Sequence, residues 1–349
     1  MTSRRPAVLA IDGGNSKADV ALLAADGSLL GAVRGPTISH QAVPLPEATS
    51  RLRALVDQVR ILAGADADAG RGAGSSLPRI SVACLAGADY PEDIKLLRRM
   101  FHEAADGGEV LVLNDTFAAL RGGASRPWGI ALICGQGING AAVAVDGRRV
   151  RFAGVGDIAG DWVGVGAVGM AGVAAAVRGR DGRGPRTALE RTIPAAVGLR
   201  RPEAVTHAYY AGRLDEERVG DLAPVVFATA ADGDDVARSI IDHLADELTV
   251  MAAALARRTN LVRRDPEVVL GGGVFKTEEP GFYARLRAGV TAAIPAARIV
   301  RLGSPPVLGA ALLGLDALAP SGAAPPSVAE RARADLDAWS ATARVEMPS

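Results

Sequence analysis

The feature that most constrains the fold is a pattern that occurs twice along the chain. In residues 7–35 an apolar segment ends in a glycine turn at Asp12–Gly14, and two further segments follow, joined by Asp26 and Gly27. An Asp-Gly pair in that place is typical of a tight hairpin turn. Residues 129–154 repeat the order of strand, glycine turn, strand, Asp-Gly turn and strand. Two copies separated by helical segments predict an internally duplicated α/β protein.

The segments around these copies fit the same class. Residues 79–87 predict a strand, and the continuous apolar run at 109–115 predicts a strand that is covered on both faces. Apolar residues at helical spacing predict a long amphipathic helix over 234–258. The other expected elements are helices at 44–63, from Pro91 onward, at 305–318 and at 327–344, and strands at 266–275 and 297–303.

Length and charge narrow the class of function. A chain of 349 residues suggests two domains, at about 150 residues per domain. Its 39 basic and 39 acidic side chains balance, so we expect no nucleic-acid partner. The longest stretch without a charge, residues 127–145, contains four glycines and is not expected to span a membrane. No signal peptide is visible and the two cysteines form no metal-binding motif, which favours a cytoplasmic location.

Three glycine turns follow predicted strands, at residues 12–17, 134–137 and 271–273. Because glycine has no Cβ, backbone N–H groups at such turns can approach a phosphate. In the first turn Asp12 could hold a hydrated Mg²⁺, and Lys17 could contact phosphate oxygens. No Walker A motif occurs, so the residues alone leave phosphate turns and plain hairpin turns as alternatives.

A glycine string of a different kind lies at Gly164–Gly169. It has the spacing of a dinucleotide fingerprint, but no apolar strand precedes it and no acid closes a second strand about 20 residues later. We therefore predict the start of a glycine-rich helix and no nicotinamide cofactor.

Several polar residues have both a functional and a structural interpretation. Asp115 stands where a strand opens into a helix, and it is either a group that faces a cleft or the N-cap of that helix. Asp157 and Asp161 lie among glycines, which favours a turn or a cap. We expect His40 to be a loop or core residue rather than a ligand, and Cys134 to be a small buried hydrophobic side chain.

Taken together, these segments resemble the superfamily of actin, hexokinase and heat-shock-chaperone ATPases. The resemblance covers about residues 7–318 and is carried, in order, by IDGGNSK, LNDTFAAL, CGQGIN, AGDWVG and LGGGVF. Within the superfamily the chain is similar to the N-acetylglucosamine kinases and to the related activators of 2-hydroxyacyl-CoA dehydratases.

The resemblance implies a duplicated actin-like, ribonuclease-H-like α/β fold, in which two lobes hold ATP and Mg²⁺ between them. The N-terminal lobe would comprise residues 1–117 and 305–319, and the C-terminal lobe residues 118–304. Residues 320–349 would form a linker and a terminal helix of unassigned role. A homodimer is also implied.

Carried over by position, the resemblance assigns the site residues. Asp115 would be the general base that takes the proton of a sugar 6-hydroxyl, and Asp12 would hold the hydration shell of the metal. Contacts to the nucleotide would come from Gly13, Gly14, Asn15, Ser16, Lys17, Gly135, Gln136, Gly137, Gly271, Gly272 and Gly273. Contacts to the sugar would come from Ser39, His40, Asn114, Asp115, Gln136, Asn139, Asp161 and Trp162.

Two positions depart from the pattern of these kinases. Gln136 stands where the second phosphate loop has Thr or Ser, and Trp162 stands where an acidic residue follows Asp161. N-acetylglucosamine is the first expected substrate, followed by glucosamine or glucose. The alternatives are an activator that shares a [4Fe–4S] cluster across a dimer through two cysteines per chain, and a nucleotide-binding regulator without transferase activity.

Overall fold

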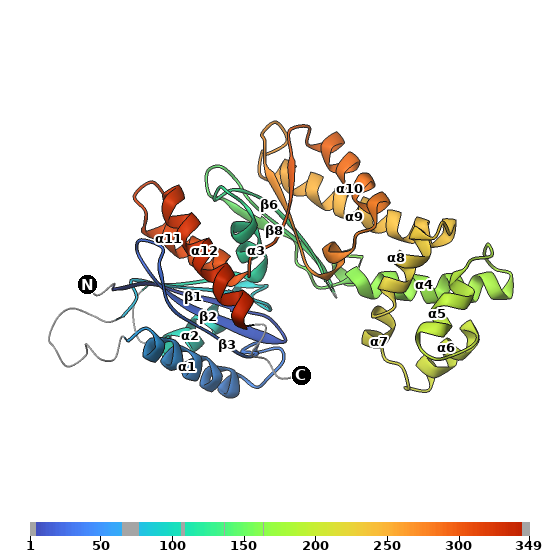
Figure 1. The fold of residues 1–349 in the computed structure, drawn as a ribbon, viewed down its shortest axis with the longest axis horizontal. Coiled ribbons are helices and arrows are strands. Elements are labelled where there is room, and N and C mark those ends of the chain that lie inside the picture. The colour runs from blue at the N-terminus through green and yellow to red at the C-terminus, as the bar shows by residue number, and fades with distance from the viewer. Residues whose placement is uncertain (1–4, 65–76, 106–108, 136, 163, 344–349) are drawn as a thin grey trace. The chain divides into compact units, whose positions relative to one another are not determined.

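The computed structural model describes residues 5–64, 77–105, 109–135, 137–162 and 164–343. The chain divides into two compact units (Figure 1). The first unit contains residues 1–129 and 302–349, and the second unit contains residues 130–301.

The first unit is built on a five-stranded sheet in the order β3-β2-β1-β4-β5. Strands β1, β2 and β3 pair antiparallel, whereas β1, β4 and β5 run parallel. The strands are β1 (Pro6–Gly13), β2 (Lys17–Ala24), β3 (Leu29–Pro36), β4 (Ile80–Leu85) and β5 (Glu109–Asn114).

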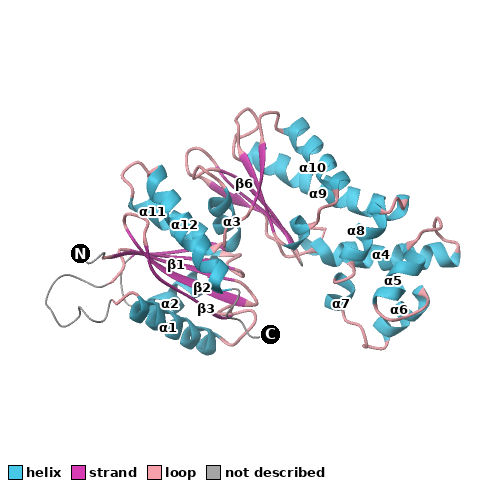
Figure 2. Ribbon diagram, viewed as in Figure 1, coloured by secondary structure: helices cyan, strands magenta, loops and turns pink. Residues whose placement is uncertain are grey.

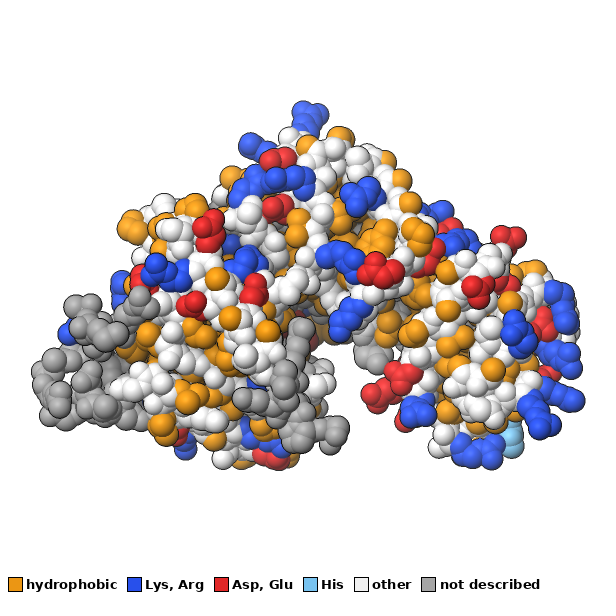
Figure 3. Space-filling model, viewed as in Figure 1, with side chains coloured by type: hydrophobic (Ala, Val, Ile, Leu, Met, Phe, Trp, Pro, Cys, Tyr) orange, Lys and Arg blue, Asp and Glu red, His pale blue; other side chains and the backbone are white. Residues whose placement is uncertain are grey.

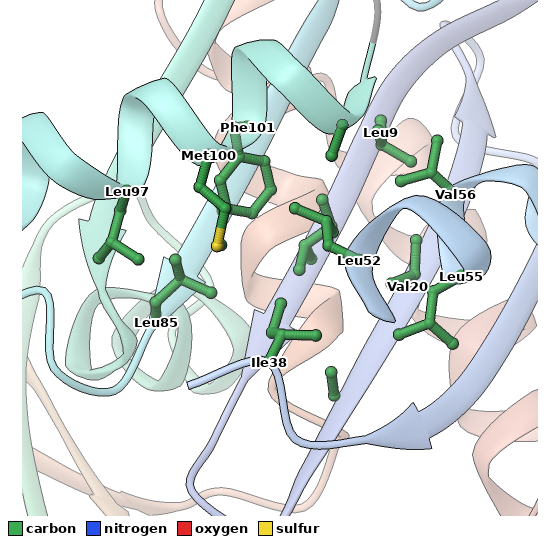
Figure 4. Packing of buried hydrophobic residues seen from close by; sticks show 14 of the residues in the cluster. Leu9, Val20, Ile38, Leu52, Leu55, Val56, Leu85, Leu97, Met100 and Phe101 are labelled. Carbon is green, nitrogen blue, oxygen red and sulfur yellow. The ribbon is translucent and has the colours of Figure 1, made fainter. Parts of the chain in front are cut away.

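Helices cover both faces of this sheet, which explains the continuous apolar runs of its inner strands. Leu9 and Ile11 of β1 belong to a core that is completed by α1 (Leu45–Leu62) and α2 (Pro91–Ala105) (Figure 4). Val8, which points to the opposite face, lies against Gly314 of α11. Helix α11 (Val307–Leu318) also packs on α3 (Asp115–Gly123), and α12 (Pro326–Ala343) packs on α11 and β3.

The second unit repeats this strand topology. Its sheet has the order β10-β9-β6-β7-β8, with β6, β9 and β10 parallel and β7 and β8 antiparallel. Read from the opposite end, this is the order of the first sheet, and the predicted internal duplication is therefore confirmed. The strands are β6 (Gly129–Cys134), β7 (Ile138–Val143), β8 (Arg149–Arg151), β9 (Glu267–Gly271) and β10 (Arg298–Arg301).

The second unit differs from the first in a series of helices between β8 and β9 (Figure 2). The longest, α9 (Asp235–Arg258), buries Ile240, Leu244, Leu248 and Leu255 of the predicted apolar stripe and packs on β7 and α10. The remaining elements are η2 (Asp157–Ala159), α4 (Gly164–Asp181), α5 (Leu189–Ala196), α6 (Pro202–Tyr210), α7 (Glu216–Gly220), α8 (Ala223–Ala231), η3 (Gly273–Lys276) and α10 (Pro280–Ala293). As predicted, the glycine string from Gly164 begins a helix.

The compact units divide the chain at other points than the lobes expected from the sequence. Their first boundary falls at residues 129 and 130 rather than 117 and 118, because α3 packs on α11. Residues 320–343 belong to the first unit, because α12 packs on β3.

The balanced charge of the sequence is visible on the surface, and the helices match the lack of a predicted membrane span. On the face drawn in Figure 3, basic and acidic side chains are interspersed. Within the described part of the chain, every helix is too short or too polar to cross a lipid bilayer.

Candidate active site

The carboxyl ends of three parallel strands bring several predicted site residues to one edge of the first sheet. In the ladder, Gly13 of β1 is level with Leu85 of β4, which is level with Asn114 of β5. Asp12 and Asp115, more than a hundred residues apart in sequence, therefore belong to the same edge of the sheet. In open α/β sheets this is the edge where ligands bind.

Asp12 lies in an environment that disfavours its charge. Burial, together with the negative charges of Asp115 and Asp19, raises the pKa of Asp12 to about 8, and Lys17 and Arg34 only partly oppose this. A divalent cation would relieve this repulsion, so the residues fit the implied Mg²⁺. Among the described residues no group of three or more His, Cys, Asp or Glu side chains is placed to hold a metal.

Asp115 is the first residue of α3 and is only partly buried. The N-cap is Asn114, whose Oδ1 accepts hydrogen bonds from the backbone N of Thr116 at 3.1 Å and from its Oγ1 at 2.6 Å. The capping role that the sequence left open for Asp115 is therefore wrong, because its neighbour fills it. The Nδ2 of Asn114 donates to Oδ1 of Asp89 at 2.9 Å, which adds a second polar loop to this edge.

The turn between β1 and β2 presents its polar residues to solvent. Asn15 and Ser16 are exposed, whereas the backbone N of Gly14 donates to the carbonyl of Lys17 at 3.0 Å. A Cβ on Gly13 would lie 2.6 Å from the Cδ2 of Leu85, so a larger residue there would have to displace that side chain. Since the amide of Gly14 is engaged, the groups of this turn that remain for a phosphate are those of Asn15, Ser16 and Lys17.

An ionic cluster that was not predicted from the sequence lies next to this turn, on β2 and β3. Asp19 of β2 is fully buried and pairs with Asp12 across the antiparallel ladder. Its carboxylate accepts from Nε and Nη2 of Arg34 at 2.6 and 2.8 Å, and from Nζ of Lys17 at 2.9 Å. The signal in the sequence was an acid inside an otherwise apolar strand, seven residues after Asp12.

Ser39 and His40 follow β3. Ser39 is buried and its Oγ accepts from the backbone N of Gln41 at 3.3 Å, as a turn residue does. Nε2 of His40 lies 3.7 Å from Oδ1 of Asp93, and its buried Nδ1 has no hydrogen-bond partner among the described residues. An orphaned ring nitrogen is what a hydroxyl ligand would satisfy.

In the second unit, the second glycine turn contacts the start of α4. The backbone N of Gly135 donates to the carbonyl of Gly137 at 2.9 Å, and the carbonyl of Gly135 accepts from Val165 at 3.0 Å. Gly164 has φ 38°, and a Cβ there would lie 2.5 Å from the carbonyl oxygen of Gly135. Gln136 lies outside the described residues.

The third glycine turn opens onto a pocket of about 510 Å³ in the second unit. Gly271 ends β9, and Gly272 has φ 105°, with its Cα so close to the backbone of Cys134 that a Cβ would lie 2.3 Å from the carbonyl oxygen. Gly273 lines the pocket. The pocket is walled by apolar side chains from α8 and η3, among them Phe227 and Val274, and its charged lining residues are Lys276, Glu278 and Glu279. Its size and lining suit a flat heterocyclic ring.

Three residues of the second unit that are predicted to contact the sugar, Asn139, Asp161 and Trp162, have different surroundings. The side chain of Asn139 packs against Gly154, where a Cβ would lie 2.3 Å from Nδ2. Burial raises the pKa of Asp161, although backbone N–H groups of residues 154–156 donate to its carboxylate and oppose the shift. Its Oδ2 is buried without a partner in the described chain. Trp162 makes an edge-to-face contact with His243, with the ring centroids 4.7 Å apart, and Asp157 is exposed in η2.

Two units with the same sheet topology, each with glycine turns at its strand ends, define an α/β protein of the actin-like ATPase fold. Residues 9–314 match the BadF/BadG/BcrA/BcrD ATPase family, and the chain belongs to this family.

Similar proteins carry sugar-kinase names. A protein from Clostridium acetobutylicum, an N-acetylmuramic acid/N-acetylglucosamine kinase, is 27% identical over 88% of this chain and 97% of its own length. The N-acetyl-D-glucosamine kinase of Dictyostelium discoideum is 25% identical over 66% of this chain and 74% of its own length. The ROK hexokinase structure from Thermus thermophilus shares the fold, with a TM-score of 0.53 and 21% identity over 87% of this chain and 96% of that chain.

Proposed function

We propose that this protein is an ATP-dependent kinase that phosphorylates the 6-hydroxyl of an amino sugar, with N-acetylglucosamine as the preferred acceptor. The observation that carries the proposal is the pair of carboxylates, Asp12 and Asp115, at the carboxyl edge of the first sheet, beside the turn that holds Lys17. The family is one of ATPases, and the names of the two relatives give the substrate class.

Phosphoryl transfer depends on positioning and charge stabilisation more than on covalent chemistry. In the proposed reaction Asp115 accepts the proton of the 6-hydroxyl while that oxygen bonds to the γ-phosphorus. The bond from the γ-phosphorus to the oxygen of the β-phosphate breaks, and ADP leaves. A carboxylate at the start of a helix, not engaged as its cap, is suited to this role.

The remaining residues would bind and orient the reactants. Asn15, Ser16 and Lys17 would donate to the terminal phosphates, and Asp12 would hold water ligands of the metal. Mg²⁺, when bound, would neutralise charge on the phosphate oxygens. The pocket beside Gly273 would take the adenine ring, because its walls are apolar.

The sugar contacts rest on polar atoms that have no partner within the described chain. They are Nδ1 of His40 and Oδ2 of Asp161, both buried. A buried polar atom without a hydrogen bond is costly, so both atoms gain most from a hydroxyl-rich ligand.

The iron–sulfur alternative is not supported by the cysteines. Cys84 in β4 and Cys134 in β6 are both fully buried, so neither offers an exposed thiolate for a shared cluster. Sugar phosphorylation accounts better for the partnerless polar atoms.

The experiment that tests the proposal is a panel of acceptors. N-acetylglucosamine, N-acetylmuramic acid, glucosamine and glucose are each incubated with Mg·ATP, and both ADP release and the 6-phosphate product are measured. We expect sugar-dependent turnover that is highest with N-acetylglucosamine. ADP release that is unchanged by every sugar would contradict the proposal and favour an ATPase or a regulator.

A further inference from the structure

The C-terminal helix α12 is firmly attached to the first unit. Oδ2 of Asp335 accepts from the backbone N of Leu29 at 3.0 Å, at the start of β3. Nη1 of Arg333 donates to the carbonyl of Gly122 and to Oγ of Ser304, both at 2.8 Å. Leu336 is fully buried. The helix is therefore an integral layer of this unit rather than a loose extension.

Near its end, α12 places an aromatic ring over a charged group of the sheet. The guanidinium carbon of Arg34 lies 5.3 Å from the centroid of the Trp339 ring. Arg34 is on β3, and its side chain is only 11% exposed. A ring in this position attracts the cation, shields it from water and restricts its rotamers.

Arg34 is the bidentate partner of Asp19, and Asp19 is also bound by Lys17. The side chain of Asp19 has no exposed surface, whereas that of Lys17 is 45% exposed. A buried carboxylate is tolerated only when cations neutralise it. Contacts thus run without interruption from Trp339 through Arg34 and Asp19 to Lys17.

The charges in this cluster explain what Arg34 does for Lys17. Arg34 and Lys17 share the carboxylate of Asp19, and both cations also act on the neighbouring Asp12. The ammonium of Lys17 spends one of its three donors on Asp19, and because the fork of Arg34 also neutralises that carboxylate, the others are less strongly held by it and can bind an anion. Without that fork, Lys17 would be the one cation left on Asp19 within the described part of the chain, and an anionic ligand would have to compete with a buried carboxylate.

We propose that α12 is a positioning element of the nucleotide site: Trp339 holds Arg34 on Asp19, which leaves Lys17 able to bind the terminal phosphates of ATP. This inference rests on the proposed function, which assigns those phosphates to the turn of Lys17. Trp339 and Arg34 are positioning residues, since the contact with phosphate belongs to Lys17.

The test compares Trp339→Ala with Trp339→Phe and with Arg331→Ala. Phenylalanine keeps an aromatic face over Arg34. Arg331 lies on the same helix, and its Nη1 forms an exposed ion pair with Oδ2 of Asp26 at 2.8 Å. Arg331→Ala removes this ion pair and leaves the contact between Trp339 and Arg34 in place. The dissociation constant of Mg·AMP-PNP is measured by calorimetry, KM values for ATP and for sugar are measured at saturation of the other substrate, and thermal midpoints report folding.

We expect Trp339→Ala to weaken binding of Mg·AMP-PNP about fivefold and to raise KM for ATP by the same factor, with KM for sugar unchanged. Trp339→Phe should recover most of the affinity, and Arg331→Ala should match the wild type. Arg34→Gln, which leaves Lys17 as the sole partner of Asp19, should weaken binding about tenfold or more.

Wild-type nucleotide affinity in Trp339→Ala would overturn the inference and leave the kinase proposal intact. An equal loss of nucleotide and sugar affinity with a lowered thermal midpoint, not restored by phenylalanine, would also overturn it, because it would indicate structural damage. If the wild type binds AMP-PNP but phosphorylates no sugar, the proposed function fails while the binding series still tests the role of α12. No binding of AMP-PNP by the wild type would overturn both.

Discussion

At the scale of single residues, neighbouring positions on one strand end have separate tasks. Asn114 satisfies the backbone at the start of α3, which frees the adjacent Asp115 from that role. Asp12 and Asp19 face each other across a ladder, but only Asp19 has cations bound to its oxygens. The carboxylate of Asp19, bound by Arg34 and Lys17, stabilises the strand pair, whereas Asp12, whose charge is disfavoured, is the one suited to a metal.

Asp115→Asn tests the assignment of the general base. The amide keeps the shape of the side chain but cannot accept the proton of the hydroxyl, so kcat should fall by about 10²–10⁴. Affinity for N-acetylglucosamine, measured by calorimetry, should stay close to that of the wild type. Asp57→Asn, at an exposed position of α1, is the matched control and should retain full activity. A wild-type kcat for Asp115→Asn would remove this residue from the mechanism.

The two thiols should be unreactive in the folded protein. Burial raises the pKa of Cys134 to about 12, so at pH 8 only about one thiol in 10⁴ is ionised, and the thiolate is the reactive form. Cys84 is also fully buried. Ellman's reagent should therefore titrate almost no thiol in native protein and two per chain in guanidinium. Rapid native labelling would reopen the iron–sulfur alternative, because it would show that a cysteine is accessible.

At the scale of elements, the packing of α3 on α11 is unusually close. A Cβ on Gly309 of α11 would lie 1.8 Å from the carbonyl oxygen of Ala118 in α3. The same two helices are joined by a buried ion pair, in which Nε and Nη2 of Arg121 donate to Asp316 at 2.6 and 3.0 Å. Gly309 therefore sets the distance at which this ion pair forms.

Gly309→Ala should destabilise the first unit, because the added methyl group has to push backbone apart. Overpacking of this kind costs about 1–3 kcal/mol, measured as a lower midpoint in urea. Gly303→Ala is the matched control, since a Cβ there meets no atom within 4 Å. If both variants unfold at the wild-type urea concentration, the helices can separate at little cost and the contact is not structurally important.

The sequence predicts elements of this fold better than it predicts contacts. The Asp-Gly turns predicted the two hairpins, helical periodicity predicted the stripe of α9, and the glycine string without a preceding strand predicted the helix that begins at Gly164, because these signals are local. The pairing of Asp19 with Arg34 joins neighbouring strands, and that of Asn114 with Asp89 joins the end of β5 to a loop 25 residues earlier. Such partners follow from register and loop conformation, which composition and spacing do not specify. The packing of α12 on β3 escaped prediction for the same reason.

At the scale of the whole molecule, duplication gives each unit a sheet and a core of its own. Each is therefore a candidate cooperative unit in unfolding. The proposed nucleotide contacts lie in both, at the turn of Lys17 in the first unit and at the glycine turn and pocket of Gly272 and Gly273 in the second. A bound nucleotide stabilises against unfolding the unit whose groups hold it.

Hydrogen exchange and calorimetry test this linkage. Mg·AMP-PNP at about 100 times its dissociation constant adds about 2.7 kcal/mol to the free energy of unfolding of whatever it binds. We expect slower exchange at residues 14–17, beside Lys17, and a rise in the thermal transition of the unit that contains them; slower exchange at 272–276 is the expected signature of the proposed adenine contact in the second unit. N-acetylglucosamine alone, as the control ligand, should leave 272–276 unprotected. Protection confined to one unit would mean that the nucleotide is held by that unit alone, and the assignment of the other glycine turns to phosphate or adenosine would then fail.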